Sequence, residues 1–375
     1  MEREELAGWL RLTLIPGLGD RTARQLLAAF GLPRAIFVQT AAALEQVVSP
    51  SQAQALLAEP ESLARQVEAV SGWLHAAEPP GSRNVVTLGD AAYPPGLLNI
   101  ADPPLLLYVQ GVLPAQWPAA IAVVGSRNPT PQGLLNSREF ACSFAQAGLT
   151  VVSGLALGVD GAAHEGALDG AAPGALATIA VVGTGLDRVY PRQHLALSHR
   201  IAQHGLIVSE YPLGTPPLPP NFPKRNRIIS ALSQGTLVVE AALKSGSLIT
   251  AGQAVEQGKD VFAIPGSIHS PQSRGCHALL KQGAKLVESA QDVLEELRPP
   301  EGPRSEARVD SQANDEAPRE DSLLSALGFD PVSLDALVAR TGIAPADLQA
   351  QLLECELRGD VARLPGGLFQ RIAAG

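Results

Sequence analysis

Residues 150–182 of the chain are TVVSGLALGVDGAAHEGALDGAAPGALATIAVV, in which two short β-branched runs flank a helical stretch. The runs are Thr150–Val152 and Thr178–Val182, and residues 159–168 between them space their apolar side chains as a helix does. The alternation extends in both directions. Further strands are expected at Ile121–Val124, Leu206–Val208, Leu237–Val239, Val261–Ala263 and Lys285–Val287, and further helices at 137–147, 193–203, 247–256 and 276–282. This alternation predicts a mostly parallel, doubly wound α/β sheet.

The α/β region, residues 82–297, follows a segment of different pattern. Residues 1–81 are helical in spacing, and Ile15-Pro16-Gly17-Leu18-Gly19 lies between two helical stretches. This turn is typical of a helix-hairpin-helix or SAM-like module, in which it binds a phosphate or serves packing alone. Asp20 is expected to cap the next helix, where an anion would otherwise bind.

The chain ends in a predicted linker and a small third module. Residues 298–321 are rich in Pro, Ser and acidic side chains, which favours a flexible linker. Residues 322–375 show three short helical stretches and then a hairpin around Pro365-Gly366-Gly367, the pattern of a winged helix. Its third helical stretch, residues 346–360, is acidic, whereas a base-reading helix carries Arg, Lys, Asn or Gln. We therefore expect this module to contact protein or to serve a structural role rather than to bind the DNA major groove.

Composition narrows the protein class. Of the 375 residues 46% are hydrophobic and 17% charged, so the chain is not disordered. It has no apolar run of membrane-spanning length, an acidic start and only three, widely separated cysteines, so we expect a cytoplasmic protein without membrane contact. The net charge of −9 comes from the flanks, because residues 82–300 carry 15 Lys and Arg against 15 Asp and Glu. A polyanion would have to bind a local patch.

Small residues follow four of the predicted strands. They are Gly125-Ser126-Arg127, Ser153-Gly154, Gly183-Thr184-Gly185 and Ser209-Glu210. Because the carboxyl ends of parallel strands meet at one edge, these backbone N–H groups and hydroxyls predict a groove that accepts phosphates. The alternative is that the glycines serve only the geometry of tight turns.

Two later segments strengthen the prediction of a polyanion site. Residues 221–227, NFPKRNR, combine Lys224, Arg225 and Arg227 with Asn226 and Phe222, whose ring is suited to stack on an unpaired base. Residues 244–250, KSGSLIT, begin a helix for which Ser247 is the expected N-cap. The plainer interpretation is a solvated helix start with Phe222 in the core.

Catalytic patterns are weaker. Asp160 and His164 lie one helical turn apart, which suits an acid–base pair but more often a structural hydrogen bond. The histidines lack metal-ligand spacing, and neither a GxGxxG fingerprint after the first strand of the sheet nor a GxxxxGK[ST] loop is present. We expect no catalytic residues, no metal and no cofactor.

Seven motifs in order give the chain a resemblance. They are IAVVGSR, VVSGLALGVDGAAHEGAL, AVVGTGLDRVYP, SEYPLGTPPLPPNFPKRNRIISALS, LVVEAALKSGSLITA, GKDVFAIPGSI and SRGCHALLKQGAKLV, within residues 85–297. Together they resemble the DNA-processing protein A family (DprA, or Smf). The resemblance implies a Rossmann-like core that binds single-stranded DNA without sequence preference, protects incoming DNA in natural transformation and helps to load a RecA-type recombinase. It further implies a homodimer that is not an enzyme.

The resemblance also implies which residues bind DNA. By position they are Gly125, Ser126, Arg127, Phe222, Lys224, Arg225, Asn226, Arg227, Ser247, Thr250, Gly275, His277 and Lys281, beside the strand-end pair Ser153 and Gly154. Arg127 and Lys224 are expected to be the main phosphate contacts, and Gly275, His277 and Lys281 to form a loop of the pocket. Leu157 stands where many members have Arg, and His277 where many have Asn.

Duplex DNA as a second ligand is an open alternative, and segments 248–263 and 276–287, which end the sheet, are our expectation for the dimer edge. A nucleotide or nucleoside-monophosphate hydrolase is the alternative function, because Gly-rich turns near Glu240 are reminiscent of phosphoribohydrolases. A third hypothesis is an adaptor that acts through the winged helix.

Overall fold

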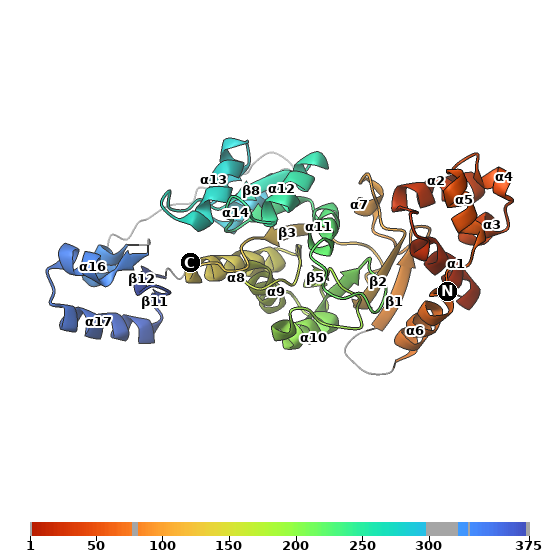
Figure 1. Cartoon of the computed structure of the whole chain (residues 1–375). Coiled ribbons are helices and arrows are strands. Elements are labelled where there is room, and N and C mark those ends of the chain that lie inside the picture. The colour runs from red at the N-terminus through yellow and green to blue at the C-terminus, as the bar shows by residue number, and fades with distance from the viewer. Residues whose placement is uncertain (1, 77–81, 298–321, 329–330, 373–375) are drawn as a thin grey trace, which may run out of the picture.

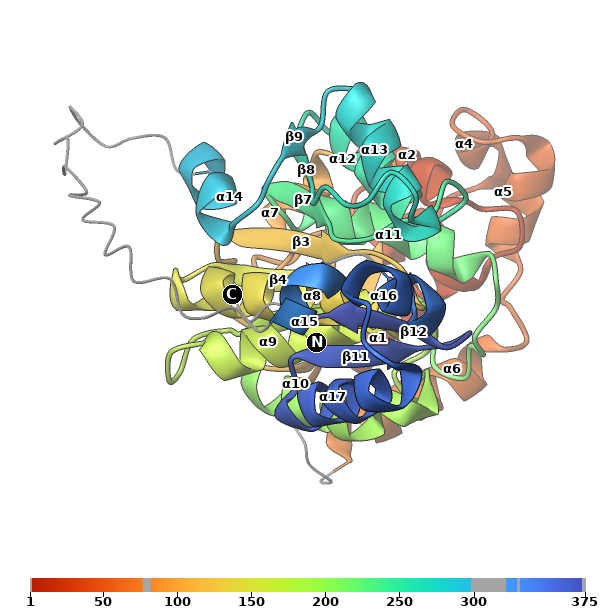
Figure 2. The same ribbon diagram turned by 90° about the vertical axis from the view of Figure 1, so that its left-hand side faces the viewer.

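The computed structural model describes residues 2–76, 82–297, 322–328 and 331–372. A nine-stranded sheet forms its centre, in the order β1-β2-β6-β5-β4-β3-β7-β8-β9 (Figures 1 and 2). The strands are β1 (Ser82–Thr87), β2 (Leu106–Gly111), β3 (Ala120–Val124), β4 (Thr150–Ser153), β5 (Thr178–Val181), β6 (Leu206–Ser209), β7 (Gly235–Val238), β8 (Asp260–Ala263) and β9 (Lys285–Leu286). All neighbours from β6 to β9 are parallel, and β2 is antiparallel to β1 and β6. The predicted mostly parallel α/β sheet is confirmed, and β1 and β2 extend it.

Helices cover both faces of this sheet. One face packs against α7 (Pro95–Leu98), α11 (Asn221–Ala231), α12 (Ser247–Glu256) and α13 (Arg274–Lys281) through a single hydrophobic cluster. The other face packs against α8 (Pro131–Gln146), α9 (Val159–Gly170), α10 (Leu195–His204) and α14 (Ala290–Leu297). The central strands are buried on both faces, which explains their nearly continuous apolar sequences.

The strand order reverses once within the parallel part. From β3 the chain places β4, β5 and β6 on one side, and β7, β8 and β9 then follow on the other side. The connections after β3 and β7 therefore diverge, and they leave a crevice at the carboxyl ends of these two strands. In doubly wound sheets such a switch point is where ligands bind.

Six helices precede the sheet within residues 2–76. They are α1 (Arg3–Leu14), α2 (Asp20–Phe30), α3 (Pro33–Phe37), α4 (Ala41–Leu44), α5 (Pro50–Leu57) and α6 (Leu63–His75). Their apolar side chains share one core with Leu105, Leu106 and Tyr108 beside and within β2, so the helical module packs against the edge of the sheet (Figure 1). Trp73 of α6 meets the ring of Tyr108 edge to face, with 6.1 Å between the ring centroids.

The turn from α1 to α2 corrects one expectation. The turn lies where the hairpin was predicted, with Gly17 at a φ of +75°, which favours glycine. However, Gly19 occupies the N-cap position, and Asp20 is the first residue of α2 rather than its cap. The Asp20 carboxylate instead faces α11, as described below. The prediction that Asp20 caps α2 is therefore wrong.

The last module has the predicted winged-helix elements. They are α15 (Ser322–Leu327), β10 (Val332–Ser333), α16 (Leu334–Thr341), α17 (Pro345–Arg358), β11 (Val361–Leu364) and β12 (Leu368–Arg371), around a core of their own. Gly342 ends α16 in the left-handed conformation, at the turn expected from Thr341-Gly342. The predicted linker lies outside the described residues. No helix of the described ranges has the length and apolarity to cross a membrane.

Candidate nucleic-acid interface

A cavity of about 690 Å³ lies at the switch point between β3 and β7. We call it the switch cavity. It is lined by the turn after β3, the loop after β7, the start of α12 and one face of α11. Eight of the predicted site residues line it: Gly125, Ser126, Arg127, Phe222, Arg225, Asn226, Ser247 and Thr250. The turn after β3 and the predicted helix start thus converge on one place. The other three predicted strand ends, Ser153-Gly154, Gly183-Thr184-Gly185 and Ser209-Glu210, are outside the cavity lining.

Two cations of the switch cavity have no ion-pair partner in the part of the chain that the structure describes. Arg127 follows β3 and Lys244 lies in the loop after β7, and both side chains are exposed. Within the described ranges neither forms an ion pair, so both charges are available to an incoming anion. The start of α12 faces the same space, and its backbone N–H groups add positive potential there.

The serines at the start of α12 differ from the expectation. Gly246 occupies the N-cap position, and Ser247 is the first helical residue, so the predicted capping by Ser247 is wrong. Its backbone N–H donates to Oγ of Ser245 at 3.3 Å, and the two hydroxyl oxygens lie 2.7 Å apart. Both serines line the switch cavity, so they present hydroxyl groups beside Lys244.

One face of α11 forms a wall of the switch cavity. Phe222, Arg225, Asn226 and Ile229 recur at helical spacing and line it together. The guanidinium of Arg127 lies 5.3 Å from the centroid of the Phe222 ring. The centroids of the Tyr190 and Phe222 rings lie 5.6 Å apart. Phe222 therefore belongs to the cavity surface rather than to the core, next to a cation and a second aromatic ring.

Arg225 is a buried part of this wall. Its guanidinium donates to the carbonyl of Val181 and lies 3.8 Å from the carboxylate of Asp160. Burial lowers the pKa of Arg225 to about 10, although Asp160 acts in the opposite direction. A Cβ on Gly154 would collide with this guanidinium, so a larger residue at that position would require Arg225 to move. The lack of a side chain at Gly154 thus leaves room for Arg225 in the cavity wall, although Gly154 itself does not line the cavity.

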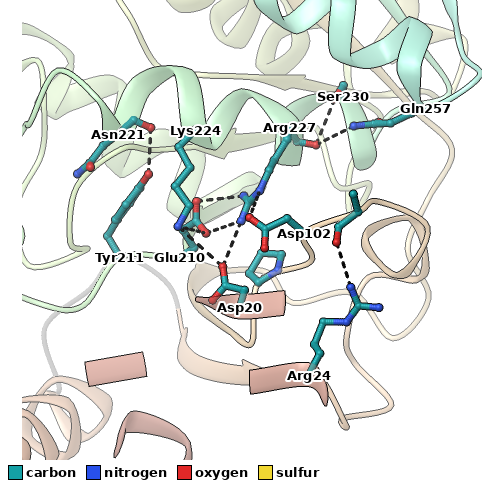
Figure 3. A network of polar contacts seen from close by, with 12 residues as sticks. Asp20, Arg24, Asp102, Glu210, Tyr211, Asn221, Lys224, Arg227, Ser230 and Gln257 are labelled. Carbon is teal, nitrogen blue, oxygen red and sulfur yellow. Dashed lines mark hydrogen bonds and ion pairs between the residues drawn. The ribbon is translucent and has the colours of Figure 1, made fainter. Parts of the chain in front are cut away.

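The other predicted cations of this segment lie on a different face of α11. Lys224 and Arg227, three residues apart, point toward the helical module (Figure 3). Arg227 donates two hydrogen bonds to Glu210, of 3.0 and 2.7 Å, and lies 3.7 Å from Asp20. Lys224 lies 3.5 Å from Glu210 and 3.8 Å from Asp20. Neither side chain lines the switch cavity, because the helical repeat directs them away from it.

Four more predicted residues also lie outside the cavity lining. Ser153 is buried and donates to the carbonyl of Val123. Gly275, His277 and Lys281 belong to helix α13 rather than to a loop of the pocket. Gly275 packs against Ala241, where a Cβ would collide, and His277 bonds to the carbonyl of Gly266. The expectation that these three residues line the pocket is therefore wrong in this structure.

The lining residues outside the predicted set include Asn128, Tyr190 and Lys244. Lys244 stands beside the predicted helix start, and its position directly before Ser245-Gly246 was the available signal. Asn128 directly follows the Gly125-Ser126-Arg127 turn and was as easily found. Tyr190 comes from the long loop after β5, and no local pattern directs it to the switch cavity.

The side chains considered for catalysis form hydrogen bonds within the fold. Asp160 accepts from the backbone N–H groups of Gly154 and Ala156, whereas His164 accepts from Leu155 and bonds to Thr178. The expected Asp160–His164 hydrogen bond is therefore replaced by separate bonds to the backbone and to β5. Glu240 accepts from both the backbone N–H and the hydroxyl of Thr130, at the start of α8. Among the described residues, no group of three His, Cys, Asp or Glu side chains is arranged to hold a metal ion.

Comparison with known proteins identifies the family. The family model described as DNA recombination-mediator protein A matches residues 84–298, which cover the whole switch cavity, and a DprA winged helix domain model matches residues 306–367. The chain belongs to the DNA recombination-mediator protein A family. The resemblance drawn from the seven motifs is thereby confirmed.

Relatives of the DNA recombination-mediator protein A family extend over most of the chain. Protein Smf from Escherichia coli K12 is 40% identical over 369 residues, 96% of this chain and 94% of that protein. The structure of DprA from Streptococcus pneumoniae has a TM-score of 0.65 at 35% identity and covers 80% of this chain and 99% of that one. DprA from Helicobacter pylori, whose single-stranded DNA binding mode has been solved, has a TM-score of 0.51 at 34% identity and covers 57% and 95%.

Proposed function

We propose that this chain binds single-stranded DNA, without sequence preference, in the switch cavity. The observation that carries the proposal is that Arg127 and Lys244, which form no ion pair within the described residues, line one concave site together with the aromatic rings of Phe222 and Tyr190. Lys and Arg neutralise phosphates, and aromatic rings stack on unpaired bases whatever the base is. The single-stranded DNA described for the Helicobacter pylori relative supports the same ligand class.

The geometry favours a single strand over a duplex. The aromatic rings line the cavity together with the cations, so a strand whose phosphates reach Arg127 brings its bases to Phe222 and Tyr190. Bases in a duplex are stacked and paired, and taking them out costs a few kcal/mol. We infer that duplex DNA binds more weakly through phosphate contacts alone.

We further propose the cellular role on the basis of family membership. In this role the cytoplasmic protein protects incoming single strands in natural transformation and homologous recombination, and loads a RecA-type recombinase onto them. It works as a homodimer, for which segments 248–263 and 276–287 are the candidate edge. Exposed Ile249 and Val255 on α12 are apolar side chains of the kind that such an edge would bury.

No observation favours the alternative of a nucleotide hydrolase. Glu240, which suggested it, is outside the cavity lining and bonded to Thr130, and Asp160 is held beside Arg225. We therefore propose a binding protein rather than an enzyme. Release of free base from nucleoside monophosphates by the purified protein would overturn this part of the proposal.

The test is fluorescence anisotropy of a labelled mixed-sequence single strand, titrated at several salt concentrations. Wild type is expected to bind with a salt dependence of several phosphates, and Arg127→Ala to lose about tenfold or more in affinity. The matched control is Arg34→Ala, which removes the same charge from an exposed site in the helical module. Equal binding by all three proteins, or no salt-dependent binding by wild type, would overturn the proposal.

A further inference from the structure

A second cavity, of about 350 Å³, lies beside the switch cavity. We call it the side cavity. Among the described residues Tyr190 alone lines both cavities, and Leu155 of the side cavity is followed in the chain by Ala156 of the switch cavity. Leu155 has a φ of +58°, a left-handed conformation that residues other than glycine rarely adopt and that clusters at functional sites. The two cavities are therefore neighbours with largely separate linings.

The floor of the side cavity changes from cationic to apolar across the sheet. Arg83 of β1 pairs with Gln110 of β2, and Gln110 pairs with Ile207 of β6. Residues that pair directly across antiparallel strands lie on one face of the sheet, so these three side chains form one row. Beyond β6 the lining continues with Val182, after β5, and Leu155, after β4, which share a hydrophobic cluster with Ile207. The charged end of the floor therefore lies at β1 and the apolar end toward β4.

Arg83 brings an uncompensated charge to this floor. Its Cζ lies 5.6 Å from the centroid of the Trp73 ring, and its Nη1 donates to the carbonyl of Trp73 at 3.1 Å. Within the described residues Arg83 forms no ion pair, and its Nε is buried without a hydrogen-bond partner. A half-buried cation of this kind attracts an anion more strongly than a solvated cation does, because the surrounding dielectric constant is lower.

The rest of the described lining does not cancel this charge. Its one acidic residue, Asp187, lies 2.8 Å from Arg188 and also accepts from the backbone N–H of Gly214 at 2.7 Å. The lining thus carries two arginines against one carboxylate, with the imidazole of His199 in addition. Residues 188–209, which supply Arg188 and His199, contain neither Asp nor Glu. The potential in the side cavity is therefore positive.

We propose that the side cavity is a second ligand site, which takes a free small organic anion with a phosphate or carboxylate group at Arg83 and an apolar body against Ile207 and Val182. Small-molecule sites combine mostly apolar walls with a few polar groups, and the volume lies at the small end of their range of roughly 300–1,000 Å³. The inference does not rest on the proposed function, because none of these three residues lines the switch cavity.

The test is a ligand-observed NMR titration with phenyl phosphate, inorganic phosphate and phenol, which carry both features of the proposed ligand or only one of them. The protein is the full chain with Arg127→Ala and Lys244→Ala, so that the cations of the switch cavity cannot hold the anion. Phenyl phosphate is expected to bind this parent protein with a dissociation constant of about 1 mM or lower, and at least about tenfold more tightly than the other two probes. Failure of phenyl phosphate to bind, or binding no tighter than that of inorganic phosphate, would overturn the inference.

Two variants of this parent protein alter the two ends of the site. Arg83→Met keeps an unbranched side chain and removes the charge, so it should weaken phenyl phosphate about tenfold and leave phenol unchanged. Leu195→Trp adds an indole to the wall, where Leu195 is 49% exposed, and should weaken both phenyl phosphate and phenol. The matched controls, Arg34→Met and Leu57→Trp at exposed sites of the helical module, should bind as the parent does.

Melting temperatures keep the test decisive. If Arg83→Met does not fold, because its contact with Trp73 is lost, Leu195→Trp decides alone. Unchanged binding of phenyl phosphate by Leu195→Trp, at the melting temperature of the parent, would then refute the site.

A last comparison separates a free ligand from the end of a DNA strand. Phenyl phosphate is titrated against thymidine strands of 20 nucleotides that carry either a 5′-phosphate or a 5′-hydroxyl group. A free small molecule as the ligand predicts that neither strand displaces phenyl phosphate from the parent protein. Displacement by the 5′-phosphorylated strand alone would assign the site to strand ends and overturn the proposal of a free ligand.

Discussion

The Asp20 carboxylate in α2 lies 3.7 Å from the guanidinium of Arg227 in α11, so the helical module is ion-paired with the α/β core (Figure 3). The helix that receives this contact also lines the switch cavity through Phe222 and Asn226. One helix therefore has a face toward the proposed DNA site and a face toward the helical module. Burial raises the pKa of the Asp20 carboxyl, against the effect of Lys224.

Neutralising Asp20 is expected to strengthen the binding of single strands. Asp20→Asn removes a negative charge 3.8 Å from Nζ of Lys224, which is 48% exposed, so that Lys224 attracts phosphates more strongly. We expect a gain of about two- to threefold at low salt that disappears at high salt. Glu4→Gln makes the same charge change at an exposed site and should leave affinity unchanged. A loss of affinity in Asp20→Asn, measured by anisotropy, would contradict this prediction.

Lys244 should contribute more to phosphate binding than Lys224. Lys244 lines the switch cavity and has no ion pair within the described residues, whereas Lys224 is paired with Glu210. Lys244→Ala should lower the slope of log affinity against log salt by about 0.7, and Lys224→Ala by less than half of that. Salt titrations of both variants test the difference. The opposite order would mean that the strand follows the other face of α11.

Glu210→Gln should destabilise the fold strongly. The Glu210 side chain is 4% exposed and bonds Arg227 at two points, so the substitution leaves the buried guanidinium short of its main partner. Breaking a buried pair from one side costs about 3–5 kcal/mol, and Asp20 and Asp102 near Arg227 place this case at the lower end. Urea unfolding measures the loss. A cost below about 1 kcal/mol would contradict the assignment of this pair as structural.

His164 should make the fold sensitive to acid. Burial lowers the pKa of His164 to about 3, against about 6.5 in the unfolded chain. Between these values the unfolded chain binds the proton and the folded chain does not, so stability is full above pH 6.5 and falls as the pH is lowered. The loss contributed by His164 between pH 6.5 and pH 5 is about 2 kcal/mol.

The control for this effect is a histidine that is exposed in the structure. His164→Gln removes the titrating group and should flatten the dependence of the unfolding free energy on pH in this range. His199→Gln, on α10, should retain the dependence of wild type because His199 is exposed. An equally steep dependence in His164→Gln would assign the acid sensitivity to other groups.

Local sequence was sufficient for most of the elements. The parallel strands β3 to β7 are short, mostly apolar runs that are buried on both faces, and the helices carry an apolar repeat, so neither depends on distant residues for recognition. The edge strand β1 and its neighbour β2 were not predicted. The run at 105–109 is apolar without alternation, and its pairing with β6 forms only when the chain returns to it about 100 residues later. Such pairing is a property of the fold and leaves no local pattern.

Local sequence and tertiary structure likewise decided different parts of the candidate site. The turn Gly125-Ser126-Arg127 was placed correctly from sequence because the carboxyl ends of parallel strands share one edge whatever the packing. The helix face was decided by tertiary structure: NFPKRNR is one cationic run in the sequence, yet α11 turns Phe222 and Asn226 toward the switch cavity and Lys224 and Arg227 toward Asp20 and Glu210. Three-dimensional packing likewise removed Gly275, His277 and Lys281 from the cavity and brought Tyr190 to it. Sequence fixes which residues follow a strand or share a helical turn, because those relations are local. Only the tertiary packing determines which face of a helix contacts the ligand and which face contacts another module.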